Sequence, residues 1–162
     1  MNVFEYEYEN RPAYAGLRTN KIIGKESGQR MEIQAIIDEI RKRPDADRIG
    51  MILSHTGIVR GTARDGRPVS GLTVAVDHHK LQQIIEKEKQ SPGIADIRVE
   101  IVENVPLSIG DEIMRLVVAG DIRDNVIPVL SRTLTAVKET VTDKTEKFVE
   151  QESDNGRIYP SG

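Results

Sequence analysis

Arginine and glycine recur in one short stretch, residues 54–74, which reads SHTGIVRGTARDGRPVSGLTV. A guanidinium group is a planar fork that binds phosphate or carboxylate with two hydrogen bonds. Arg60 lies next to Gly61 and close to Gly57, where the backbone can approach a ligand closely. We therefore expect Arg60 to bind an anion. Arg64 and Arg67 are better explained as charges that keep the tip of a loop in solvent.

The other residue types that carry chemistry form no recognisable site. His78 and His79 are adjacent and point in different directions on either a helix or a strand, and His55 lies on another element. No carboxylate spacing completes a zinc site with them, so we interpret all three as surface or strand-end histidines. The chain contains no cysteine, no nucleophile elbow, no P-loop and no dinucleotide-binding glycine motif. The sequence predicts neither a metal nor a cofactor.

Length and composition are typical of one globular domain. The 162 residues are 38% hydrophobic and 30% charged, with a net charge of -3. An anion site must therefore be local, since no overall positive field attracts nucleic acid or a membrane surface. No apolar run reaches the ~18 residues of a membrane span. The acidic, aromatic N-terminus does not resemble a signal peptide, which favours a cytoplasmic location.

The pattern of apolar residues predicts an α+β fold with a mainly antiparallel sheet and helices packed on it. We expect strands 48–60 and 68–77 to pair as a hairpin around the basic loop 61–67. The remaining expected elements are helix 31–43, helix 79–90, strand 97–102, strand 112–119 and helix 121–141.

The last helix positions a lysine at the border of its buried face. Its expected apolar stripe runs at spacings of three and four, with Pro128 inside it as a kink or an irregular first turn. The stripe consists of Ile122, Val126, Leu130, Leu134, Val137 and Val141. Lys138 lies about 90° from the centre of this stripe, where a lysine can extend into a cleft or remain at the surface.

Both ends of the chain fall outside the predicted core. Residues 1–29 are expected to form an arm, with a possible strand at 3–9. Residues from about Asp143 onward are polar and expected to be mobile, although Ile158 and Tyr159 could dock.

Several motifs in the same order resemble the large subunit of molybdopterin synthase, the MoaE family. They are His55-Thr56-Gly57-Ile58-Val59-Arg60, Val69-Ser70-Gly71-Leu72, Ile109-Gly110-Asp111-Glu112 and the helix end Val137-Lys138. The likeness covers residues 30–147, which leaves 1–29 as an arm and 148–162 as a polar tail. It implies an α/β hammerhead fold and a homodimer.

The resemblance also implies a reaction and its partners. A small ubiquitin-like carrier with a C-terminal Gly-Gly thiocarboxylate would deliver sulfur to a cyclic pyranopterin monophosphate. Lys138 matches the principal lysine of the family, and Arg60 and Arg123 match arginines that hold the anionic substrate. These cations would converge, with Arg64, Lys144 or Lys147 completing the site.

The sequence departs from the family at several positions. Glu103 and Asn104 replace a His-Arg pair after the third strand, and Thr145 replaces a second lysine. Ala75 and Asp77 replace a Glu and a Tyr. Two hypotheses therefore remain: a divergent synthase subunit, or a non-catalytic paralogue that keeps the dimer and binds a carrier or another anionic ligand.

Overall fold

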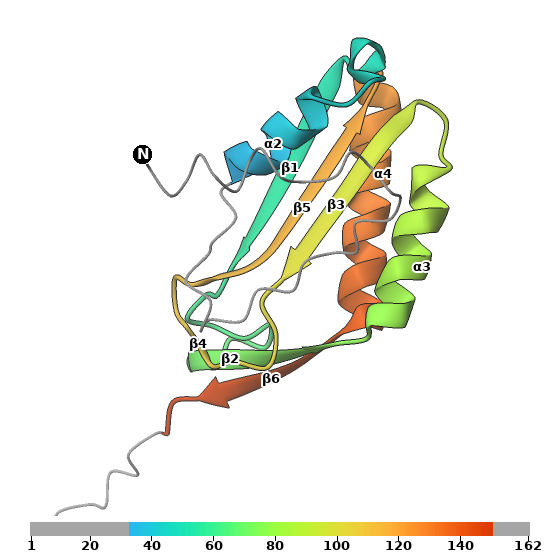
Figure 1. Ribbon diagram of the computed structural model, residues 1–162. Coiled ribbons are helices and arrows are strands. Elements are labelled where there is room, and N and C mark those ends of the chain that lie inside the picture. The colour runs from blue at the N-terminus through green and yellow to red at the C-terminus, as the bar shows by residue number, and fades with distance from the viewer. Residues whose placement is uncertain (1–32, 151–162) are drawn as a thin grey trace, which may run out of the picture.

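The computed structural model describes residues 33–150, so the expected strand at 3–9 and the residues Ile158 and Tyr159 lie outside it. The helices within this range are α2 (Ile33–Arg41), η2 (Ala46–Arg48), α3 (His78–Lys89), α4 (Arg123–Ala136) and the π-helical turn η3 (Val137–Val141). The strands are β1 (Met51–Ile58), β2 (Val69–Val76), β3 (Ile94–Ile101), β4 (Leu107–Ser108), β5 (Glu112–Gly120) and β6 (Thr142–Phe148). The predicted α+β class is confirmed (Figure 1).

The first sheet has β5 at its centre, with β1 and β3 antiparallel on either side. Side chains of β5 alternate between the two faces. Met114, Leu116 and Val118 belong to the main core, whereas Val117 and Ala119 pack with isoleucines of α2. Helices α3 and α4 therefore cover one face, and α2 covers part of the other (Figure 1).

The second sheet, in the order β4-β2-β6, crosses the lower end of the first (Figure 1). The predicted hairpin between 48–60 and 68–77 is wrong, because β1 pairs with β5 while β2 pairs with β4 and β6. The connecting loop turns the chain out of one sheet and into the other. From there Leu72 and Val74 enter the main core. An alternating pattern identifies a strand but does not choose its partner.

Strand β6 corrects the expectation of a mobile tail from about Asp143. Its sequence, TDKTEKF, carries mostly polar side chains, and its residues are exposed or half-buried. The strand is held by its antiparallel ladder with β2. Polar residues are common on such edge strands, because the backbone hydrogen bonds, not the side chains, maintain the pairing.

Helix α4 lies where the apolar stripe predicted a helix, with shorter bounds. Ile122 precedes the helix and is 54% exposed, so it does not belong to the buried stripe. Val126, Val129 and Thr133 are buried, and the helix continues through Pro128. Of the helices within residues 33–150, none is long and apolar enough to cross a membrane.

Candidate functional site

The basic loop between β1 and β2 is anchored at its apolar residues and exposes its arginines. Val59 and Ala63 are buried. The Gly66 N–H donates to the Ala63 carbonyl at 3.1 Å, and Gly66 has a φ of 87°, which a glycine adopts without strain. The loop therefore has a defined backbone and is more than a solvated tip.

The three arginines of this loop differ in their surroundings. Arg67 is ion-paired with Asp65 at 2.7 Å, and its guanidinium lies 3.8 Å from the centre of the Phe148 ring. Arg67 thus joins the loop to β6, a contact that its interpretation as a solvated charge did not predict. Arg60 and Arg64 are exposed and have no ion-pair or hydrogen-bond partner within residues 33–150. Two cations of this loop are therefore available to an anion.

Lys138 is presented by the π-helical turn that follows α4. Its neighbours Val137 and Val141 are buried in the main core and fix the turn on both sides. The lysine itself is exposed, and no carboxylate within the described range pairs with it. A fixed backbone and a free ammonium are what an anion-binding or reacting lysine requires.

His55 lies on the same side of the first sheet as Lys138. Its register partner on β5 is Leu116, a residue of the main core that α4 covers. Burial and the positive charge of Lys138 both lower the pKa of His55 below its usual value of 6.5. The interpretation of His55 as a surface or strand-end histidine is therefore wrong. The sequence signal for its burial was its position in the middle of a strand, on the same face as Leu53.

The predicted cations are attached to different parts of the fold. At the start of β2 the Val69 N–H donates to the Gly61 carbonyl, next to Arg60. Just past its other end the Asp77 N–H donates to the Val141 carbonyl, in the turn that carries Lys138. Eight extended residues span about 26 Å. The backbone next to Arg60 and the turn that carries Lys138 are therefore anchored at opposite ends of β2.

The other two candidates are also separate from Arg60. Arg123 begins α4, three residues after Gly120, which pairs with Met51 at the far end of the first sheet. It is strongly exposed and lies 3.6 Å from Asp124. Lys144 lies opposite Val74 on β6 and is ion-paired with Glu146 at 2.5 Å. Arg123 is therefore at the opposite end of the first sheet from Arg60 and does not converge on it within one chain. The convergence of Lys138 on Arg60 stays a prediction.

The two residues that replace the family's His-Arg pair have structural partners. The carboxylate of Glu103 lies 3.0 Å from Nε2 of His78. Asn104 has a φ of 55°, and its N–H donates to the Val74 carbonyl at 2.8 Å. Asparagine tolerates this left-handed conformation better than most side chains. The two residues join the end of β3 to α3 and to β2.

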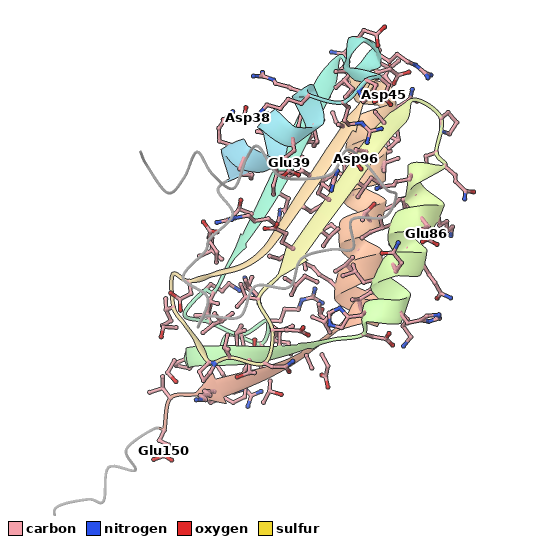
Figure 2. The ribbon with its side chains drawn as sticks, viewed as in Figure 1. Asp38, Glu39, Asp45, Glu86, Asp96 and Glu150 are labelled. Atoms are coloured by element: carbon pink, nitrogen blue, oxygen red, sulfur yellow. The ribbon has the colours of Figure 1, made fainter. Side chains whose placement is uncertain are left out.

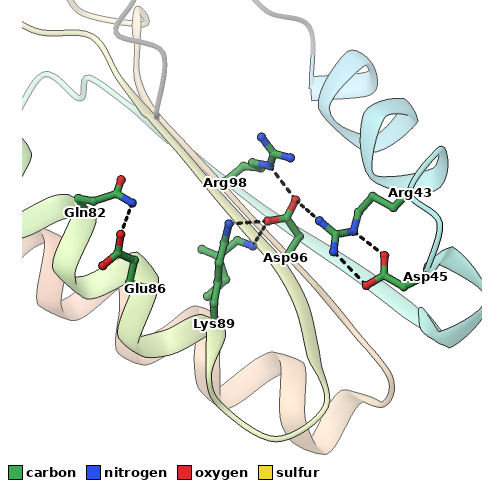
Figure 3. A network of polar contacts seen from close by, with 8 residues as sticks. Arg43, Asp45, Gln82, Glu86, Lys89, Asp96 and Arg98 are labelled. Carbon is green, nitrogen blue, oxygen red and sulfur yellow. Dashed lines mark hydrogen bonds and ion pairs between the residues drawn. The ribbon is translucent and has the colours of Figure 1, made fainter. Parts of the chain in front are cut away.

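A second charged cluster lies at the opposite end of the molecule, around Asp96 (Figures 2 and 3). This carboxylate is fully buried. Lys89 Nζ and Arg98 Nε each lie 2.8 Å from it, and Arg43 Nη1 lies at 3.4 Å. Because Arg43 follows α2, Lys89 ends α3 and Asp96 is on β3, the cluster links three elements. With the carboxylate at its centre, it is a structural link and not an anion site.

Within residues 33–150 no group of three or more His, Cys, Asp or Glu side chains is arranged to hold a metal ion. The candidate chemistry of the described range is therefore that of its free cations, at Lys138 and at the loop carrying Arg60 and Arg64.

Comparison with protein-family models gives one match. The model described as MoaE protein matches residues 26–140 of this chain. The matched range includes both the basic loop and Lys138. No curated protein sequence matches the chain.

Solved structures share the fold over most of the chain. A molybdopterin synthase from Staphylococcus aureus is 19% identical with a TM-score of 0.64, covering 84% of this chain and 96% of its own. Molybdopterin cofactor biosynthesis protein E from Burkholderia multivorans is 19% identical with a TM-score of 0.63, covering 88% and 97%. A chain in the complex of subunits 1 and 2 of the Helicobacter pylori molybdopterin-converting factor is 17% identical with a TM-score of 0.58, covering 83% and 92%.

Proposed function

This chain belongs to the MoaE family, and we propose that it acts as the large subunit of a molybdopterin synthase in molybdenum cofactor biosynthesis. It transfers sulfur from a thiocarboxylated small carrier to a cyclic pyranopterin monophosphate. The observation that carries the proposal is Lys138, a cation without a partner in the described range, on a turn that two core valines hold in place.

Each proposed role follows from the charge and surroundings of a residue. Lys138 approaches the thiocarboxylate of the carrier, which is anionic and attracted by an ammonium. Arg60 and Arg64 bind the phosphate of the pterin, for which a guanidinium fork is suited. Lys144 is a weaker candidate, because Glu146 already pairs with it.

We further propose that the working protein is a homodimer with a small carrier subunit bound to each chain. The position of Arg123 at the far end of the first sheet supports the dimer, since a second copy can place its own Arg123 near Lys138. A complex of two subunits among the structural neighbours supports the carrier.

Sulfur transfer with purified components tests the proposal. The wild-type protein is mixed with a thiocarboxylated carrier ending in Gly-Gly and with the pterin monophosphate, and the dithiolene product is measured. Lys138→Ala should lower the rate by about 100-fold or more while the melting temperature stays unchanged, because the exposed side chain contributes little to the core. Lys87→Ala, an exposed lysine at the end of α3, is the matched control and should keep full activity.

Arg60→Ala should act differently from Lys138→Ala. An arginine that binds the phosphate equally in the ground and transition states changes KM and leaves kcat nearly unchanged. Equal activity of Lys138→Ala and wild type would contradict the proposed mechanism.

A non-catalytic paralogue is the second candidate function. It is favoured by the Glu103–His78 pair, which places a carboxylate where the family has cations. Such a protein would bind the carrier but transfer no sulfur, so carrier binding by calorimetry without product formation would select it.

A further inference from the structure

His55 occupies an unusual place for a histidine. It lies on β1, an edge strand of the first sheet, and its side chain is on the face that α4 covers. The side chains around it on that face of β5 are Leu116, opposite it, and Met114. An imidazole among aliphatic side chains loses the hydration of its ring nitrogens, which requires a compensating partner.

The Nε2 atom of His55 has no such partner. It is shielded from solvent and makes no hydrogen bond within residues 33–150. It lies over Gly57, since a Cβ built on that glycine would be 3.7 Å from Nε2. Buried polar atoms without a partner are rare in folded proteins, and each calls for a functional or structural explanation.

The fold brings Lys138 toward His55, because α4 packs against β1 and the turn η3, which carries Lys138, continues directly from the end of α4. Burial, followed by the Lys138 ammonium on η3, lowers the His55 pKa. The residues facing the ring from β5 are uncharged, and Lys138 is the charged group that acts on the ring from the α4 side. At neutral pH the imidazole is therefore uncharged and has one nitrogen that accepts a hydrogen bond. An amine on a flexible four-carbon stem is a suitable donor.

We propose that His55 is a positioning residue for Lys138, with Nε2 accepting a hydrogen bond from the lysine amine when the site holds its substrate. The inference rests on the proposed function, because it assigns the partner that orients the reacting lysine. This hydrogen bond explains two observations together. Within the described residues, Nε2 of His55 lacks a donor, and the Lys138 ammonium lacks an acceptor. His55 also makes the activity fall at acidic pH, since a protonated imidazole repels the Lys138 ammonium and accepts no hydrogen bond from it.

The pairing is tested first without any sulfur transfer. The titration of His55 is followed by NMR through its ring protons in wild type, Lys138→Met and the control Lys87→Met. Lys138→Met should raise the His55 pKa, and Lys87→Met should leave it unchanged. The reactivity of Lys138 toward acetic anhydride, measured by mass spectrometry across pH, should change in His55→Phe. If the His55 pKa is the same in Lys138→Met and wild type, the pairing is overturned.

Catalysis then tests positioning through three variants of His55. Glutamine places its amide oxygen near the position of Nε2, whereas the shorter asparagine reaches only the position of Nδ1. His55→Gln should keep kcat within about threefold and lose the acidic limb of the pH profile. His55→Asn and His55→Phe should both lower kcat by about 10- to 100-fold, with little change in the KM for the carrier.

The outcomes distinguish the positioning role of His55 from the proposed sulfur-transfer function. Equal kcat values for His55→Phe and wild type would refute the positioning role even if Lys138 is essential. If wild type transfers no sulfur, the proposed function fails, while the NMR titration and the labelling of Lys138 still decide whether the pair exists.

Discussion

Asp96→Asn is expected to destabilise the protein, because one fully buried carboxylate balances three cations (Figure 3). Burial raises the pKa of Asp96. The hydrogen bond from Lys89 and the charges of Arg98 and Lys89 outweigh it, so the pKa lies below its usual value of 3.8. Asp96 is therefore ionised in the folded protein at neutral pH. Asparagine keeps the shape and removes the charge.

The size of the effect follows from the exposure of the partners. Breaking a buried ion pair by removing one member costs about 3–5 kcal/mol. Here the cations Arg43, Lys89 and Arg98 are 27–40% exposed, so they regain part of their hydration. The asparagine oxygen also retains the hydrogen bond from the Ile97 N–H, which is 2.9 Å long in the wild type. We therefore expect a loss of about 2 to 3 kcal/mol, or a melting temperature lower by about 4–12 °C.

Urea unfolding at pH 7, followed by circular dichroism at one fixed protein concentration, measures this loss. Asp45→Asn is the matched control, because in the part of the chain that the structure describes Asp45 pairs with Arg43 alone, and its side chain is 38% exposed. It should lose less than about 1 kcal/mol. Equal losses in the two variants would refute the argument that burial makes Asp96 the centre of the cluster.

The pH dependence of stability gives an independent check on Asp96. Because its folded pKa is depressed, its contribution is complete above the unfolded value near 3.8 and is lost as pH falls through the lower folded value. Wild type should therefore lose more stability than Asp96→Asn in that acidic range.

Two further substitutions test the second sheet and the end of β3. Gly71→Ala should lose about 1 to 3 kcal/mol, because a Cβ there would lie 2.4 Å from the Leu107 carbonyl oxygen. Gly61→Ala, whose nearest contact is a side chain at 3.4 Å, is its control and should be nearly neutral in urea unfolding. Asn104→Arg should lose about 1 kcal/mol because of the left-handed backbone, whereas Asn104→Gly should match or exceed wild-type stability. A stable Asn104→Arg would show that this backbone conformation relaxes easily.

The individual elements were largely predictable from the sequence, and their pairing was not. The helical spacing of Ile36 and Ile40 predicted α2, and both isoleucines are buried. The strands expected at 97–102 and 112–119 were also found, as β3 and β5. The pairing of β2 with β4 and β6 instead of β1 depends on contacts between residues distant in sequence. A local pattern of apolar residues carries no information about such contacts. Strand β6 had no apolar signal because its pairing with β2 uses the backbone.

In the candidate site, too, the residue types could be predicted from the sequence and their relative positions could not. Arg60 could be selected as a candidate from the sequence because a guanidinium beside glycines suits an anion. Lys138 was selected through the resemblance to the MoaE family, since a lysine at the border of a buried face can equally remain at the surface. The distance between them could not be predicted, since it depends on the direction in which β2 crosses the end of the first sheet. His55 was missed for a related reason. A histidine in an alternating strand is consistent with either face, and only the packing of α4 over β1, with Lys138 on the turn that follows α4, brings its ring toward Lys138. Residues that act through a neighbour from another element therefore become identifiable only when the burial of each polar atom is known.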